Sequence, residues 1–382
     1  MAKREKSEDL SEEATLMVAL RDAKKHTMLY YIKALVKYGA SDLHLKPSKP
    51  AAFRINGRLV LTKMELLHAT DVEKIIFELL NEKQKQKLQE KLQLDFSFYY
   101  EGLGRFRCNV FYQKGTLSAV VRMIPLIHKS MDHLGLPPVL KELCHRQRGL
   151  ILVTGETGSG KSTTLASMVQ YINETRPVHI ITIEDPIEYI YQDQKASITQ
   201  RELGSDTHSF KEALTAGLRQ DPDVILVGEM RDADTIHTAI MAAETGHLVF
   251  STLHTMDAKG TVDRILDFFE APTRQQVRMQ LSSNLLAVVS QRLILKADQS
   301  DRVPACEVLI KSPTIENCIM NNELEKITTI IESSTAYYKM QTFNQDLYRL
   351  VKSGLITEEE AIRGSNNPDD LRLSLSGIDR EK

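Results

Sequence analysis

The sequence predicts an α/β protein with two domains, from its length and from a change in hydrophobic pattern along the chain. With 382 residues, the chain exceeds the size at which a single hydrophobic core keeps growing. Its first part alternates strand-like and helical segments. Its second part has short continuous apolar runs between helical patterns, which is typical of buried parallel strands in a doubly wound sheet. The boundary is expected between residues 126 and 138, near the pair Pro137-Pro138.

Residues 21–130 are expected to form the first domain, after a flexible, charged tail over residues 1–20. Apolar residues spaced by three and four predict a helix, and alternating segments with Pro and Gly predict strands joined by turns. The expected order is a helix over 28–36, short strands over 41–61, a charged helical segment to about 92 and strands over 96–124.

Residues 131–364 are expected to form the second domain. Four apolar runs predict its parallel strands: 150–154, 179–183, 224–227 and 248–252. After about Ala271 the pattern is largely helical, and residues 365–382 are expected to be a loosely attached tail. Ligands of open α/β sheets bind beyond the carboxyl ends of the strands, so functional residues are expected just after the four runs.

Composition argues against a nucleic-acid-binding protein and against a membrane-spanning one. Hydrophobic residues make up 42% and charged residues 26%, and the net charge of -2 gives no basic excess of the kind that marks a nucleic-acid partner. No apolar run approaches the roughly 20 residues that span a bilayer, and no secretory signal pattern follows the charged start. We therefore expect a cytoplasmic protein without a membrane span. Four scattered cysteines predict neither a zinc site nor disulfides: Cys108, Cys144, Cys306 and Cys318.

The first run leads into a phosphate-binding pattern, G-x-x-x-x-G-K-[ST], that opens a helix near Lys161. Glycines let backbone N–H groups surround phosphate oxygens, Lys161 reaches the outer phosphates, and the Ser162 hydroxyl binds Mg²⁺. A glycine turn with a surface lysine is the poorer alternative, because a strand and a helix flank the pattern. The expected ATP-binding residues are Gly155, Glu156, Thr157, Gly158, Ser159, Gly160, Lys161, Ser162 and Thr163.

Carboxylates follow the second and third runs. Three acids lie within the five residues from Glu184 to Glu188, and although loop acids are usually only solvated, this position favours orienting the water of a hydrolysis reaction. After the third run, Gly228 stands where many P-loop enzymes have a magnesium-binding aspartate. Glu229 is therefore expected to bind Mg²⁺, partly through water.

Two histidines accompany the fourth run. The run is expected to end around His247, and His254 lies beyond it. A lone histidine is more often a structural residue than a catalytic one. Two near one strand of the same sheet favour a phosphate sensor.

In this order, the four segments resemble the Walker A, Asp, Walker B and His boxes of type II and type IV secretion ATPases. Further segments are similar to the PilT/PilU family of type IV pilus retraction ATPases: 41–45, 104–107, 199–204, 228–232 and 242–247. The resemblance covers nearly the whole chain. It implies a homo-hexamer in which an N-terminal PAS-like domain and a C-terminal RecA-like domain with a helical extension close over ATP.

The resemblance also assigns roles to residues. Glu188 would activate water, Glu229 would be the Walker B carboxylate, and His247 and His254 fall on the His-box positions. Three arginines match those that the family presents to the phosphates from the first domain: Arg105, Arg107 and Arg122. Surface ion pairs are the alternative for any one of them; arginine fingers are favoured because developing phosphoryl charge needs such donors.

The family implies a motor that acts on an inner-membrane platform protein of the PilC type and drives pilus retraction and twitching motility. Assembly and type II secretion motors usually carry a four-cysteine zinc element and a longer N-terminal region, which this chain lacks. One segment departs from PilT proteins. Their Ala-Ile-Arg-Asn-Leu-Ile-Arg-Glu motif, linked to retraction, corresponds to residues 314–321, where both arginines are replaced.

Three alternatives therefore stay open. The chain could be a PilU-like accessory motor that depends on a separate PilT, a regulatory subunit that binds ATP without hydrolysis, or a nucleic-acid translocase. Intact Lys161, Glu188 and Glu229 argue against the regulatory subunit. The neutral charge balance argues against the translocase.

Overall fold

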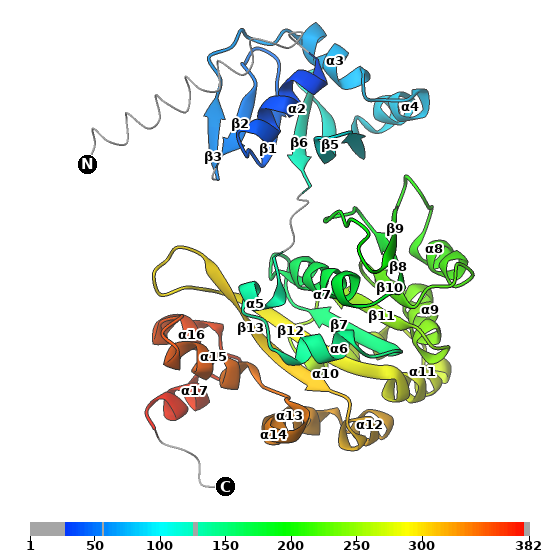
Figure 1. Ribbon diagram of the computed structural model, residues 1–382, viewed down its shortest axis with the longest axis vertical. Coiled ribbons are helices and arrows are strands. Elements are labelled where there is room, and N and C mark those ends of the chain that lie inside the picture. The colour runs from blue at the N-terminus through cyan, green and yellow to red at the C-terminus, as the bar shows by residue number, and fades with distance from the viewer. Residues whose placement is uncertain (1–26, 56, 125–128, 378–382) are drawn as a thin grey trace. The chain divides into compact units, whose positions relative to one another are not determined.

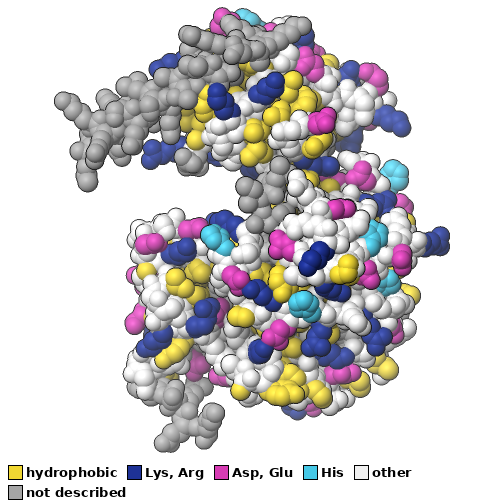
Figure 2. All heavy atoms as spheres, in the orientation of Figure 1, with side chains coloured by type: hydrophobic (Ala, Val, Ile, Leu, Met, Phe, Trp, Pro, Cys, Tyr) yellow, Lys and Arg dark blue, Asp and Glu magenta, His cyan; other side chains and the backbone are white. Residues whose placement is uncertain are grey.

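The computed structural model describes residues 27–55, 57–124 and 129–377 and divides into two compact units, Met1–Leu126 and Ile127–Lys382 (Figure 1). The tail expected at residues 1–20 lies outside the described residues. Within the described residues, no helix is long and apolar enough to cross a membrane. On the face shown in Figure 2, acidic and basic side chains are interspersed over both units.

The first unit is a six-stranded antiparallel sheet in the order β3-β2-β1-β6-β5-β4. Its strands are β1 (Asp42–Leu45), β2 (Ala52–Ile55), β3 (Arg58–Leu61), β4 (Gln93–Tyr100), β5 (Gly104–Gln113) and β6 (Thr116–Met123). Its helices are α2 (Met28–Lys37), α3 (Ala69–Phe77) and α4 (Glu82–Lys91). The predicted order of helix, strands, helices and strands is confirmed.

Residues alternate between the two faces of this sheet, as the period of two in a strand requires. One set is fully buried against the helices and includes Phe53, Phe106 and Val121. The other set is polar. It includes Asp42, which is buried but accepts hydrogen bonds from Ser41 and Arg122, 2.7 Å each. Burial raises the pKa of the Asp42 carboxyl, but these bonds and the nearby arginine charges outweigh burial and lower it.

The second unit is built on a seven-stranded sheet in the order β13-β12-β7-β11-β10-β8-β9. Six strands are parallel and the edge strand β13 is antiparallel to β12. The strands are β7 (Gly149–Thr154), β8 (His179–Glu184), β9 (Ser197–Glu202), β10 (Val224–Val227), β11 (Leu248–Leu253), β12 (Leu285–Leu295) and β13 (Arg302–Ile310). All four predicted runs are strands: β7, β8, β10 and β11.

Helices cover this sheet. Helix α7, which packs with α5 and α6, and helix α9, which packs with α8 and α11, both contact β7. The helices are α5 (Met131–Leu134), α6 (Val139–Cys144), α7 (Lys161–Thr175), α8 (Phe210–Gly217), α9 (Ala233–Glu244), α10 (Ala258–Asp267) and α11 (Ala271–Asn284). The central strands are buried along their whole length because helices lie on the sheet. The four cysteines are buried and free.

The expectation of a largely helical pattern after Ala271 is wrong for two long strands, β12 and β13. All of β13 after Arg302 and the middle of β12, from Ala287 to Gln291, are continuously buried, so neither strand shows the alternation that marks a half-buried strand. An apolar run that is buried on both sides does not distinguish a strand from a buried helix by periodicity. The hairpin of β12 and β13 extends the sheet beyond β7.

A helical region follows the hairpin. Its elements are α12 (Pro313–Met320), the 3₁₀ helix η1 (Leu324–Lys326), α13 (Ile327–Ser333), α14 (Thr335–Tyr338), α15 (Phe343–Lys352), α16 (Glu358–Gly364) and α17 (Pro368–Leu375). Helices α15 and α16 pack on the hairpin, and α17 packs on these two helices, around a small separate core that includes Phe343, Leu347 and Leu371. The loose tail expected over 365–382 is therefore wrong for α17, which begins after an Asn367 cap and buries Leu371. Residues 378–382 lie outside the described residues.

The packing of α17 predicts a large effect for one leucine of this helix and a small effect for another. Leu371→Ala should destabilise the protein by about 2–5 kcal/mol, because Leu371 is 1% exposed. Leu373→Ala is the matched control, since Leu373 is 39% exposed and should change stability by less than about 1 kcal/mol. Thermal or denaturant unfolding of both variants measures the difference. Equal effects would mean that α17 does not pack on α15 and α16 through Leu371.

Candidate nucleotide-binding site

The loop over residues 155–160 joins β7 to α7 in a conformation that needs glycine. Gly155, Gly158 and Gly160 have φ values of 143°, 82° and 89°, in the range that residues with a Cβ rarely adopt. Space is also limited. A Cβ on Gly155 would lie 2.4 Å from the Gln291 carbonyl oxygen, and one on Gly160 would lie 2.8 Å from Gln291 Nε2. The backbone conformation therefore favours glycine at all three positions, and the close approach of β12 adds a second requirement at Gly155 and Gly160.

Lys161 begins α7 and turns back over the loop. Its Nζ donates hydrogen bonds to the carbonyl oxygens of Gly155 and Glu156, at 2.8 and 2.9 Å. Burial lowers the pKa of Lys161, and the charges of Glu229 and Glu188 oppose this effect. The ammonium thus lies at the loop that is suited to phosphate, next to backbone oxygens that a phosphate would replace.

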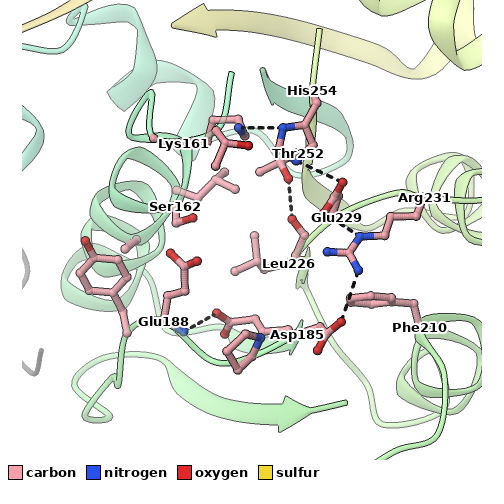
Figure 3. A pocket seen from close by; sticks show the side chains of 18 of the residues that line it. Lys161, Ser162, Asp185, Glu188, Phe210, Leu226, Glu229, Arg231, Thr252 and His254 are labelled. Carbon is pink, nitrogen blue, oxygen red and sulfur yellow. Dashed lines mark hydrogen bonds and ion pairs between the residues drawn. The ribbon is translucent and has the colours of Figure 1, made fainter. Parts of the chain in front are cut away.

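A pocket opens at the carboxyl ends of β7, β8, β10 and β11 (Figure 3). Each strand supplies a group to it: Lys161 and Ser162 come after β7, Glu188 after β8, Glu229 after β10 and His254 after β11. Because parallel strands end at one edge of a sheet, segments up to about a hundred residues apart meet here. The structure brings these five predicted residues into one pocket, together with Thr157 and Gly158.

Ion pairs and hydrogen bonds connect the side chains at this edge (Figure 3). His254 Nε2 lies 3.2 Å from Glu229 Oε1, and Arg231 Nε lies 2.8 Å from Glu229 Oε2. Arg231 also reaches Asp185 at 3.4 Å, and Lys161 Nζ lies 3.5 Å from His254 Nδ1. A neutral His254 with its proton on Nε2 satisfies both of its contacts, because the lysine is a donor and the carboxylate an acceptor.

Polar side chains of β8 and β9 hold the loop that carries Glu188. Glu202 Oε2 accepts from the Ile187 N–H at 3.1 Å, and Glu184 Oε2 accepts from the Glu188 N–H at 3.4 Å. Gln200, on β9, donates to the Tyr189 carbonyl at 2.8 Å and accepts from the Tyr191 N–H at 3.0 Å. Two adjacent strands therefore fix the backbone on both sides of Glu188.

Glu184 is the most buried carboxyl of the pocket lining. Burial raises its pKa to about 7, although hydrogen bonds from Thr182, from the Glu188 N–H and from Gln200 oppose the shift. Its Oε1 accepts a hydrogen bond at 2.7 Å from the hydroxyl of Thr182, which lies two residues earlier on β8. Glu188 lies further out, where its side chain points into the pocket (Figure 3).

The oxygen atoms that line the pocket are of the kinds that bind a magnesium ion together with a nucleotide. Mg²⁺ prefers hydroxyl, carboxylate, water and phosphate oxygens, and keeps several waters. The Ser162 hydroxyl and the carboxylates of Glu188 and Glu229 line the same pocket. No sulfur or second histidine competes for the ion among the residues that line it.

The remaining phosphate-loop residues lie around the pocket. Glu156, Ser159 and Gly155 border a second hollow on the side of β12, and Gly160 borders a third. Thr163 is the third residue of α7, and its hydroxyl forms a 2.8 Å hydrogen bond with the Tyr189 hydroxyl.

The structure does not bring His247 to this pocket. The fourth strand begins at Leu248, so His247 precedes it instead of ending it, and six strand residues separate the two ends by roughly 20 Å. Its ring Nδ1 donates to the Ala242 carbonyl at 2.9 Å, and its carbonyl accepts from the Gly149 N–H. His247 caps the turn between α9 and β11, so the expectation of two histidines at one site is wrong within a single chain.

The three predicted arginines lie in the first unit, on the polar face of its sheet. Arg107 and Arg122 are register partners across β5 and β6, and Arg105 is two positions from Arg107. Arg122 pairs with Asp42 at 2.7 Å and Arg107 with Asp95 at 3.6 Å. The side chains of Arg107 and Arg122 are 44% and 68% exposed, so their ion pairs leave donors for a further partner.

Sequence reasoning missed several residues of the site. Arg231 lies in a predicted segment, but the sequence indicates no role for it, and Asp185 was expected only as one of the three acids of the Glu184–Glu188 segment. Gln291 and Gln200 lie on β12 and β9, which were not predicted, so no signal near the phosphate loop indicates them. They lie near the site only because their strands pair with neighbouring strands of the sheet.

A glycine loop between a parallel strand and a helix, with a lysine at the loop and carboxylates on the adjoining strands, defines a P-loop ATPase. A family model described as "Type II/IV secretion system protein" matches residues 23–363, and the chain belongs to this family.

Named relatives cover most of the chain. The "Type IV pilus retractation ATPase PilT" of Pseudomonas aeruginosa is 45% identical over 88% of this chain and 97% of its own length. The "Type IV pilus ATPase PilU" of the same organism is 40% identical over 90% of each chain. A crystal structure of the pilus retraction motor PilT with bound ADP has a TM-score of 0.84 and 49% identity, and covers 91% of this chain and 99% of that one.

The contacts of Gln200 predict an effect on turnover. Gln200→Leu keeps the size of the side chain but removes its bonds to Tyr189 and Tyr191, so the loop that carries Glu188 should loosen. We expect the kcat for ATP hydrolysis to fall about tenfold while the KM for ATP changes less than about threefold.

Gln192→Leu is the matched control, because Gln192 lies on the same loop with an exposed side chain. It should leave both constants within about twofold. Steady-state kinetics of the two variants measure the contrast. A Gln200→Leu variant that is folded and turns over like the wild type would contradict the positioning of Glu188 by β9.

Proposed function

We propose that this protein is an ATP-hydrolysing motor that drives retraction of type IV pili and thereby twitching motility. The observation that carries the proposal is the convergence of Lys161, Glu188 and Glu229 on one pocket beside the phosphate loop. The similarity to a pilus retraction ATPase over 97% of that relative's length supports the mechanical output.

The geometry supports a specific division of work at the pocket. The N–H groups of the loop and the start of α7 would hold the phosphates, and Lys161 would leave the Gly155 and Glu156 carbonyls to reach the outer phosphate oxygens. Ser162 would hold Mg²⁺ directly and Glu229 through water. A bound magnesium ion neutralises phosphate charge.

Glu188 is the best candidate to orient the attacking water and take its proton. It points into the pocket, and its backbone is held by Glu184 and its neighbours. His254 would then report on the outer phosphate, because it lies between Lys161 and Glu229. When Lys161 moves to the phosphates, His254 loses its contact with Lys161 and keeps its contact with Glu229.

We infer a homo-hexamer in which Arg105, Arg107 and Arg122 of the first unit face the phosphates. Their position on one face of the sheet and the exposure of Arg107 and Arg122 support this role. The motor would act in the cytoplasm at the inner-membrane base of the pilus machine, on a platform protein of the PilC type. RecA-like rings can also move nucleic acid, but the chain has no basic excess that supports this use.

A second candidate is a PilU-like accessory motor that depends on a separate PilT-type ATPase. The observation that favours it lies on α12. Glu316 and Met320 occupy the two arginine positions of the retraction motif, four residues apart on one side of the helix, and Met320 is 41% exposed. Glu316 pairs with Lys311 at 3.5 Å. Because these positions lie outside the core, the replacements leave the fold intact and change only the surface.

The first test is ATP hydrolysis by the purified protein and by Glu188→Gln. Loss of a positioned base should lower kcat by about 100-fold or more while ATP binding stays within about threefold. Size-exclusion light scattering on the same samples measures the oligomer. The matched control is Glu174→Gln, an exposed carboxylate on α7.

Each outcome separates the candidates. A hexamer whose activity is lost in Glu188→Gln supports an autonomous motor. A wild type that binds ATP but turns over only after a PilT-type ATPase is added supports the accessory motor. Full activity of Glu188→Gln contradicts the role of Glu188.

A further inference from the structure

Strand β12 runs beside the phosphate loop. It pairs in parallel with β7, with Ser290 opposite Thr154, the last residue before the loop. The two hydroxyls of this pair form a 2.8 Å hydrogen bond. The next residue along β12, Gln291, therefore lies where the loop begins, although about 130 residues separate the two segments in sequence.

Gln291 is 2% exposed and uses both ends of its side-chain amide on the loop and the helix after it. Its Nε2 donates to the Ser159 carbonyl at 2.7 Å, and its Oε1 accepts from the Thr164 hydroxyl at 2.7 Å. One buried side chain thus links the last part of the loop to the first turn of α7.

The bond to Ser159 sets the direction of a peptide group. In a trans peptide, the C=O and the following N–H point in opposite directions. Because the Ser159 carbonyl is directed at Gln291, the Gly160 N–H is directed away from β12. Loop N–H groups that bind phosphate must point at the ligand before it arrives, since turning a peptide costs binding energy.

We propose that Gln291 is a positioning residue that holds the phosphate loop in its nucleotide-binding conformation. This inference rests on the proposed binding of ATP at the loop. Gln291 does not line the pocket that contains Lys161 and Glu188, so it acts through the loop backbone.

The chemistry of the position favours glutamine. It requires a donor for a carbonyl and an acceptor for a hydroxyl, both buried, and a primary amide supplies both without charge. Glutamate of the same shape would keep the acceptor for Thr164 but lose the donor for Ser159, and it would bring a negative charge close to the bound phosphates. Leucine of similar size would leave the Ser159 carbonyl without its donor.

The test uses full-length Gln291→Leu and Gln291→Glu, with Gln341→Leu as the matched control. Gln341 also donates from its side chain to a backbone carbonyl, that of Cys306 at 2.8 Å, but it lies before α15 and away from the loop. The measurements are the Kd of a fluorescent ATP analogue with Mg²⁺, the KM and kcat for ATP, and the Tm without nucleotide and with ADP.

We expect Gln291→Leu to raise the Kd and KM about tenfold and Gln291→Glu to raise them further, with kcat at saturating ATP within about threefold of the wild type. The rise of Tm on adding ADP should shrink in both variants. Gln341→Leu should lower the Tm with and without ADP by similar amounts, and leave the Kd, the KM and the rise of Tm on adding ADP unchanged. If Gln291 has only a structural role, its variants should behave like Gln341→Leu.

Folded Gln291 variants that bind the analogue within about twofold of the wild type would overturn the inference. If Gln291→Leu fails to fold, Gln291→Glu and Thr164→Val, which removes only the hydroxyl bond, decide the question by the same Kd. A wild type that does not bind the analogue would instead contradict the proposed function. The two failures are thus distinguished by the wild-type sample.

Discussion

The parallel pairing of β7, β11, β10 and β8 is the constraint on which the site depends. Val227 of β10 pairs with Ile183 of β8 and with Ser251 of β11, and Leu253 of β11 pairs with Thr154 of β7. With this register, the four strands end at one edge, and the segments that follow them face one another. The pocket is then formed by the phosphate loop, two segments with carboxylates and a histidine, although these parts are far from one another in sequence.

The alignment of the four strand ends does not by itself fix the positions of the reactive groups. Two further strands, β9 and β12, hold the loops that carry these groups. Strand β9 holds the loop around Glu188 through Gln200 and Glu202, and strand β12 contacts the phosphate loop through Gln291. These supports are buried or half-buried side chains that bond to backbone groups, so they fix the path of the chain. The pocket can therefore keep its shape while Lys161, His254 and Glu229, which contact one another mainly through side chains, rearrange around phosphate.

Much of this arrangement could be predicted from the sequence, because it depends on local patterns. Short apolar runs indicated β7, β8, β10 and β11, and the glycine pattern indicated the loop and the start of α7. The rest depends on tertiary contacts. Strands β12 and β13 are buried on both sides and lack alternation, Gln291 is linked to the loop only through strand pairing, and α17 is held by a single fully buried leucine, Leu371. His247 directly precedes the apolar run 248–252, so it lies at the amino end of β11, at the opposite edge of the sheet from His254.

The most direct measurement is a structure of the protein with Mg²⁺, ADP and beryllium fluoride, which mimics the outer phosphate before hydrolysis. The account predicts the fluoride group beside Lys161 Nζ, with that nitrogen released from the Gly155 and Glu156 carbonyls, and the Glu188 carboxylate facing the attacking water. A nucleotide bound away from the loop, or a Glu188 side chain turned out of the pocket while another group faces the water, would contradict it.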